Sequence, residues 1–299
     1  MKAQTGTSAD AVNQSAQHIL YVEGTADGID VSVLKELVGP RLLVRPLGSC
    51  FSLRSVSAAL HPHHPEWWFI IDRDHWNDEE VDKSWRNFPN PAEQNLLIWR
   101  RKELENYFLE PHWLSGTGWL KPGRTESDLQ AWLCKKATAQ LTVGAANRVL
   151  LTKREAVKGA KIPLFEPSDF STCRTPADGA GILCNADQIR QLQDAGGVGL
   201  DAATLRREFE EEVLLLSGGE AQLAWNVGRW RELLPGKELF RDMVREFLNV
   251  RDLTGALQGQ RAYRALGRTL LRDHPEAMPQ DFRDLKQILD RFTNTPLRT

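Results

Sequence analysis

The chain has 299 residues, of which 41% are hydrophobic and 26% are charged, and its formal net charge is −2. This composition is typical of a globular protein and excludes a chain that is disordered throughout. No stretch approaches 18 uncharged apolar residues, so the sequence predicts no transmembrane helix. The cysteines are scattered without a C-x-x-C pair, which is typical of reduced thiols in a cytoplasmic protein. They are Cys50, Cys134, Cys173 and Cys184.

Residues 1–16 are polar and contain no apolar core, so we expect a short flexible leader and not a secretory signal. Over residues 17–125, short apolar runs alternate with helical patterns. Strands are predicted at 18–22, 42–44, 67–71 and 95–99. Helices are predicted up to about residue 38 and at 51–60, and a helix or helical turn at 102–109. Continuous apolar strands alternating with helices predict a Rossmann-like α/β domain with a mainly parallel sheet covered on both faces.

Residues 126–299 have a different pattern, which predicts a mostly α-helical C-terminal region. Residues 127–158 fit one long helix or two, and 159–186 are rich in Pro, Gly, Ser and Asp, which predicts a loop or an irregular insertion. Further helices are predicted at 200–216, 221–234, 237–249, 260–273 and 280–292. The fold class is therefore α/β, with the sheet domain over 17–125 followed by helices.

Acidic side chains follow two of the predicted strands. Glu23 and then Gly24 come directly after the first strand, and Asp72 and Asp74 come after the third. If these strands are neighbours in a parallel sheet, the carboxylates converge at its carboxyl edge, where ligands of such sheets bind. Carboxylate oxygens are the ligands that Mg²⁺ prefers, and Mg²⁺ commonly bridges to phosphate. Taken singly, each acid can equally end a strand, begin a turn or cap a helix.

The segments around these acids resemble a known family of metal-dependent domains. Residues 21–27 (YVEGTAD) and 69–74 (FIIDRD) are similar to the glutamate and DxD motifs of the Toprim domain of topoisomerases, primases and OLD-family nucleases. Residues 102–109 (KELENYFL) are similar to a segment of the small OLD-like single-Toprim proteins. That family includes the AriB-like effectors of PARIS anti-phage defence, which the chain also resembles in length and layout.

The resemblance implies a role for each matching acid. Glu23 is expected to be the general acid/base or to position a metal, with Asp72 and Asp74 as metal ligands and Asp27 as the acid that often follows the glutamate. Glu103 and Glu105 are candidates for a second metal, or else they pair with basic neighbours at a helix start. The catalytic set is then Glu23, Asp27, Asp72, Asp74 and Glu105, and the metal set is Glu23, Asp72, Asp74 and Glu103.

Basic residues near the C-terminus are candidates for binding nucleic acid. Four arginines spaced three or four residues apart form one stripe on a predicted helix, namely Arg261, Arg264, Arg268 and Arg272. Such a stripe can follow a phosphate backbone, or it can be a solvated helix face. Lys237 is at a position where related proteins often carry a basic residue, but Gly-Lys after a proline is also a plain turn into a helix.

The resemblance implies an Mg²⁺-dependent nuclease, with one or two ions and Mn²⁺ as a possible substitute. Its expected role is a cytoplasmic anti-phage toxin that cleaves host tRNA as a homodimer once an AriA-like ATPase partner releases it. The chain has no G-x-x-x-x-G-K-[ST] motif, so that ATPase is expected to be a separate protein. The alternatives are a DNA-nicking nuclease of OLD type and a non-catalytic module that docks on an ATPase.

Overall fold

The computed structural model describes residues 18–48, 50–74, 76–90, 95–157 and 161–293, so the expected leader lies outside the described residues. Contacts within the chain group it into two compact units. The first unit joins the chain up to Arg124 with the residues from Val244 onward, and the second unit is Thr125–Met243. Among the described residues, no helix combines the length and the apolar character needed to cross a membrane.

The first unit is built on a four-stranded parallel sheet with the order β2-β1-β3-β4. Its strands are β1 (Ile19–Val22), β2 (Leu43–Pro46), β3 (Trp67–Ile71) and β4 (Leu96–Ile98). The last four residues of β3 are buried, as expected for a strand that is covered on both faces. The predicted α/β class and the parallel sheet are therefore confirmed.

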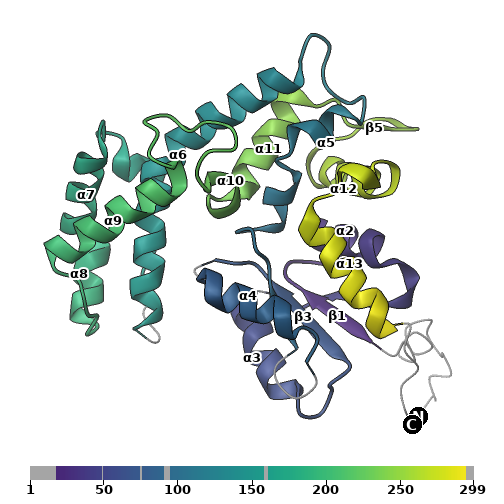
Figure 1. The fold of residues 1–299 in the computed structure, drawn as a ribbon, viewed down its shortest axis with the longest axis horizontal. Coiled ribbons are helices and arrows are strands. Elements are labelled where there is room, and N and C mark those ends of the chain that lie inside the picture. The colour runs from purple at the N-terminus through teal and green to yellow at the C-terminus, as the bar shows by residue number, and fades with distance from the viewer. Residues whose placement is uncertain (1–17, 49, 75, 91–94, 158–160, 294–299) are drawn as a thin grey trace, which may run out of the picture. The chain divides into compact units, whose positions relative to one another are not determined.

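Helices cover both sides of this sheet (Figure 1). They are α2 (Ile29–Val38), α3 (Cys50–Leu60) and α4 (Asp78–Asn87). The chain leaves β1 in one direction, to β2, and leaves β3 in the opposite direction, to β4. Because parallel crossovers are right-handed, this reversal places α2 on one face and α3 and α4 on the other. The carboxyl ends of β1 and β3 thus form the switch point of the sheet, where ligands bind in folds of this kind.

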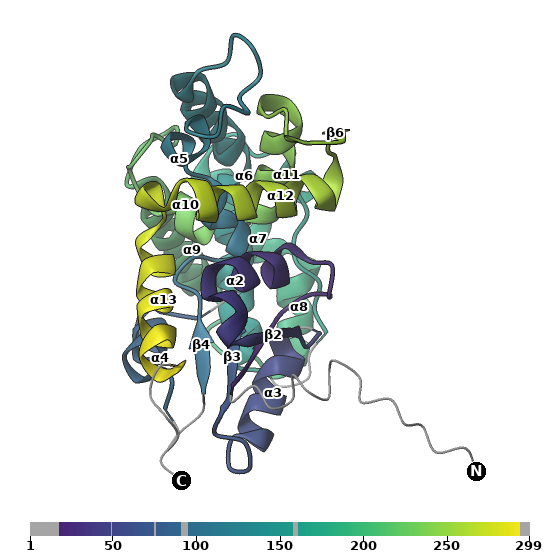
Figure 2. The same cartoon turned by 90° about the vertical axis from the view of Figure 1, so that its right-hand side faces the viewer.

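The C-terminal helices α12 (Gly259–Asp273) and α13 (Gln280–Thr293) belong to the same unit and pack against α2 (Figure 2). The packing is tight at Gly267, where an added Cβ would lie 2.7 Å from Cγ2 of Val33. The sequence placed these helices in a separate region after residue 125. The contacts of α12 and α13 with α2 group them instead with the sheet.

Hydrogen bonds fasten α13 to the end of β4. Tyr107, in the 3-10 helix η2 (Leu104–Phe108), donates its hydroxyl to Oδ2 of Asp281 at 2.6 Å. Arg100 donates to Oδ1 of Asp281 at 2.7 Å and to Asp284 at 3.1 Å, and its guanidinium lies over the ring of Trp85. The segment 102–109, predicted as a helix or helical turn, contains the short 3-10 helix η2 with a buried tyrosine.

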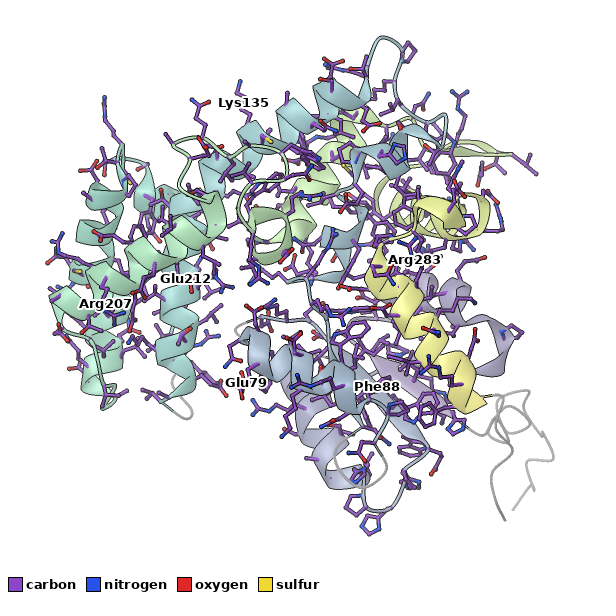
Figure 3. All side chains as sticks on the ribbon, in the orientation of Figure 1. Glu79, Phe88, Lys135, Arg207, Glu212 and Arg283 are labelled. Carbon is purple, nitrogen blue, oxygen red and sulfur yellow. The ribbon has the colours of Figure 1, made fainter. Side chains whose placement is uncertain are left out.

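The second unit is helical and contains one long helix where the sequence allowed one or two. Its elements are α6 (Glu126–Glu155), η3 (Pro167–Phe170), α7 (Pro176–Asn185), α8 (Asp187–Asp194), α9 (Ala202–Ser217) and α10 (Trp230–Leu233). α6 packs against α9, and Arg148 of α6 pairs with Glu212 of α9 at 2.6 Å (Figure 3 labels Glu212). α11 (Gly236–Phe247) begins in this unit and ends in the first.

Two predictions in this region were wrong in part. The expected irregular insertion at 159–186 contains α7, whose start is fixed by a capping box between Thr175 and Asp178. The expected helix at 221–234 is limited to the single turn α10, because Gly228 has a φ of 66° and interrupts the helical pattern. The remaining short elements are η1 (Gly39–Arg41), α5 (Pro111–Ser115), β5 (Arg251–Asp252), β6 (Gly255–Ala256) and η4 (Pro275–Ala277).

Candidate acidic site at the sheet edge

Glu23 and Asp72 meet at the switch point of the sheet. Val22 is in register with Ile70, so each acid directly follows its strand on adjacent parallel strands. Oε1 of Glu23 accepts a hydrogen bond of 2.8 Å from the backbone N–H of Asp72. The predicted adjacency of the first and third strands is confirmed, and it brings these two acids together.

The loop after β1 needs glycine at its second position. Gly24 has a φ of 92°, in the region that side chains with a Cβ rarely adopt. Its N–H donates to the carbonyl of Gly48 at 2.9 Å, which ties the loop after β1 to the loop after β2. The turn at Gly24 therefore fixes where the backbone leaves Glu23.

Arg73 fixes the segment that carries the two aspartates, a role that was not predicted from the sequence. Its side chain is 3% exposed and donates from Nε to the carbonyl of Trp76 at 3.1 Å. Its other nitrogens donate to the carbonyl of Arg100 at 2.8 Å and to Asp78 at 2.6 Å. Its position between two acids was the only signal in the sequence. A buried arginine with three acceptors holds the segment against β4 and α4.

Asp72 and Asp74 differ in their surroundings. Asp72 is 5% exposed, whereas Asp74 is half-buried and has a φ of 42°. Aspartate tolerates the left-handed region better than most residues, yet such a conformation still carries strain of about 1 kcal/mol or more. Strain of this kind persists where the surrounding structure imposes it, and the hydrogen bonds of Arg73 supply that constraint.

The other acids of the predicted site have different partners. Asp27 is 92% exposed and pairs with Arg264 of α12 at 3.3 Å. Glu103 precedes η2 and caps it in a capping box with Asn106, while Glu105 lies within η2 and is 8% exposed. The arginines before these glutamates form ion pairs with other acids. Arg100 pairs with Asp281 of α13, and Arg101 pairs with Glu110 at 2.7 Å. A second metal at Glu103 and Glu105 stays a prediction.

The donor set at this edge suits a hard cation. Throughout the described part of the chain, no three His, Cys, Asp or Glu side chains are grouped closely enough to form a metal site of their own. Mg²⁺ does not need such a cage, because it commonly binds through one or two carboxylates, retains waters and takes further oxygens from a phosphate. Glu23, Asp72 and Asp74 thus fit Mg²⁺ by their chemistry.

The predicted basic residues lie in both units. Arg261, Arg264 and Arg268 line a pocket between α12 and α2, in the same unit as the acids. Lys35 of α2 lines it too, a residue that the sequence analysis missed. Lys35 is the one basic residue of α2, and no motif in the sequence distinguished it. Lys237 is exposed in the first turn of α11 and belongs to the second unit.

No model of a known protein family matches the chain, and no curated protein matches it either.

Proposed function

We propose that this protein is an Mg²⁺-dependent phosphodiesterase of the Toprim class that cleaves nucleic acid. The observation that carries the proposal is the contact between Oε1 of Glu23 and the N–H of Asp72, at the carboxyl ends of adjacent parallel strands. The motif resemblance of residues 21–27 and 69–74 supports the same assignment. The order β2-β1-β3-β4 puts this contact where ligands of doubly wound sheets bind.

Asp72 and Asp74 would hold the cation, with Glu23 beside them. Mg²⁺ bound there would neutralise charge on a phosphate and lower the pKa of an attacking water. Glu23 is suited to take or give a proton at its carboxylate, because the N–H of Asp72 fixes one of its oxygens. Arg73 keeps both aspartates in place through its buried hydrogen bonds.

The narrower proposal is an AriB-like effector that cleaves host tRNA when an AriA-like ATPase partner releases it, and that is active as a homodimer. It rests on the resemblance of residues 102–109 and on the layout of the chain. Tyr107 in that segment also fastens α13 to the sheet, which gives the motif a structural role in this chain. The same catalytic chemistry acting on DNA is the alternative that the experiment below separates.

The test compares wild-type protein with Glu23→Gln and Asp72→Asn, both in cells and as purified protein. We expect toxicity on expression with the partner and trigger present, new tRNA ends, and cleavage that EDTA abolishes and Mg²⁺ restores. Glu79→Gln is the matched control, because Glu79 is an exposed acid in the first turn of α4 (Figure 3). Both site variants should lose cleavage by about 100-fold or more, and the control should not.

The outcomes separate the alternatives. If RNA stays intact while DNA is nicked, and Glu23→Gln abolishes the nicking, the protein is still a phosphodiesterase but its substrate is DNA. Equal behaviour of wild type and both site variants would overturn the enzymatic proposal. The acids would then be structural, and a module that docks on an ATPase would be the better description.

A further inference from the structure

A basic pocket lies between α2 and α12, within the unit that carries the acidic site. Its volume is about 400 Å³, in the range of small-ligand sites. Four cationic side chains line it, Lys35 from α2 and Arg261, Arg264 and Arg268 from α12. Val31 and Leu257 add apolar surface. The pocket therefore offers positive charge beside an apolar wall.

The packing of α12 on α2 creates this arrangement. Gly267 lets the two helices approach closely, since an added Cβ would contact Val33. Leu266 and Leu270 are buried on the packed face of α12. The arginines, spaced three and four residues apart, therefore share a different face, which borders the pocket. Neither helix alone would present all four cations.

Cations outnumber acids around the pocket. Asp252 is the acid among the lining residues, and Asp27, outside the lining, pairs with Arg264 at 3.3 Å, so the four cations exceed these two carboxylates by two. The hydrogen bonds from Thr254 lower the pKa of Asp252, so Asp252 is ionised at neutral pH and counts as one of the two carboxylates.

We infer that this pocket binds a phosphate group of the nucleic-acid substrate, together with the sugar or base attached to it. This inference rests on the proposed function and adds to it the site where the nucleic-acid substrate binds. Arginines bind phosphate oxygens through paired N–H donors, and the apolar wall suits a sugar or the face of a base. A free nucleotide carries the same groups, so the test includes it.

The pocket lies close to the acids along the chain. Ala26 lines the pocket, and Glu23 is three residues before it, so their Cα atoms are separated by about 11 Å at most. The pair between Asp27 and Arg264 joins this loop to α12. A nucleic-acid chain that is bound through one phosphate in the pocket thus has a neighbouring phosphate within reach of Glu23 and Asp72.

The experiment measures binding of full-length protein to a 5′-phosphorylated single-stranded RNA over a range of salt concentrations, in EDTA so that no cleavage occurs. Arg261→Gln and Arg268→Gln should each weaken binding about tenfold or more. Each should also reduce the slope of log affinity against log salt by about 0.7. Arg283→Gln is the control, since Arg283 is exposed on α13 (Figure 3). It should change neither quantity.

A further variant separates a pocket from a charged helix face. Arg272 continues the stripe on α12 but pairs with Asp273 at 2.7 Å and is not among the residues that line the pocket. If the pocket binds the phosphate, Arg272→Gln should lose little RNA affinity. Equal losses for Arg261→Gln, Arg268→Gln and Arg272→Gln would overturn the pocket in favour of a diffuse electrostatic face.

Competition identifies the source of the phosphate. If a nucleoside monophosphate displaces the RNA at a concentration comparable to that of the RNA, and binds more weakly to Arg261→Gln, the pocket is a site for a free nucleotide. That result would overturn its role in binding the substrate.

Failure of the inference is distinguishable from failure of the proposed function. If the pocket variants bind RNA normally while Glu23→Gln abolishes cleavage, the inference alone fails. If the pocket binds RNA phosphate but the wild type cleaves nothing, the proposed function fails.

Discussion

Oε1 of Glu23 accepts a hydrogen bond of 2.8 Å from the backbone N–H of Asp72, across residues that are 49 positions apart in the chain. The side chain of the residue that follows β1 thus accepts from a backbone donor beyond the end of β3. This relationship joins stability to the proposed chemistry, because the same carboxylate holds the segment that carries both aspartates.

Replacement of Glu23 should separate these two roles. Glu23→Gln retains an oxygen that accepts from Asp72, so we expect its free energy of unfolding to lie within about 0.5 kcal/mol of wild type. Glu23→Ala leaves that N–H without its acceptor and should cost about 1–2 kcal/mol. Urea denaturation of the three proteins measures the difference. Equal stability of Glu23→Ala and wild type would show that the hydrogen bond contributes nothing.

Arg73 should be the residue of this edge whose loss is most costly. Arg73→Met keeps much of the side-chain volume but removes the donors to Trp76, Arg100 and Asp78. Two backbone carbonyls then lose their hydrogen-bond donor, and we expect a cost of about 2–3 kcal/mol. Arg86→Met on α4 is a surface control, because Arg86 is exposed. Denaturation midpoints that shift equally in both variants would contradict this role.

Asp74 should show a conflict between stability and function. Its φ of 42° suits glycine, so Asp74→Gly should be more stable than Asp74→Ala by about 1 kcal/mol. Both variants lose the carboxylate, and neither should cleave nucleic acid. Thermal unfolding and a cleavage assay on the same preparations measure the two effects. An active Asp74→Gly protein would exclude Asp74 as a metal ligand.

Tyr107 should anchor α13 through a neutral hydroxyl. Burial, together with the charge and hydrogen bond of Asp281, raises the pKa of Tyr107 well above its usual value, so the hydroxyl stays a donor at physiological pH. We expect Tyr107→Phe and Asp281→Asn to be non-additive, with a coupling energy of about 1 kcal/mol or more. A double-mutant cycle from urea denaturation measures it. Additive effects would mean that the contact does not stabilise the helix.

His18 should make the fold less stable in mild acid. Burial lowers its pKa below the ordinary value of 6.5, although a hydrogen bond and the charge of Glu66 oppose the shift. The unfolded chain therefore binds a proton more readily than the folded one between the lowered pKa and 6.5. Stability from this group is complete above pH 6.5 and declines as the pH falls through the folded pKa.

The measurement for His18 compares the free energy of unfolding at about pH 7.5 and about pH 5.5 in wild type and His18→Phe. The phenyl ring retains stacking like that of His18 on Trp68, whose ring centre lies 4.4 Å away, but it cannot titrate. The variant should lose less stability than wild type over this interval. An identical loss would assign the pH dependence to other groups.

Local pattern sufficed for the sheet and for several helices. Five consecutive apolar residues at 67–71 can be buried on both faces, and they form β3 within the predicted bounds. The same reasoning failed at 221–234, where the pattern suggested one helix and Gly228 interrupted it. Propensity over a short window does not reveal which glycine adopts a positive φ.

The position of the acids was predictable in outline because the strands that precede them are strongly apolar. A parallel sheet with β1 beside β3 leaves little choice for where Glu23 and Asp72 lie. The buried contacts of Arg73 were not predictable, since an arginine between two aspartates looks like a surface residue in sequence. Two of its acceptors, Trp76 and Asp78, follow within five residues, but the third is the carbonyl of Arg100, 27 positions away beyond β4, which only the fold brings near.

The sequence by itself determined the α/β class, the strand ends that carry the acids and the arginine spacing of α12, because each depends on residues that are adjacent or one helical turn apart. Only the tertiary structure decided that α12 and α13 return to the sheet and that Lys35 joins the arginines in one pocket. These features depend on contacts between residues more than 200 positions apart, such as Asp27 with Arg264. Side-chain packing selects such contacts, and no local periodicity encodes them.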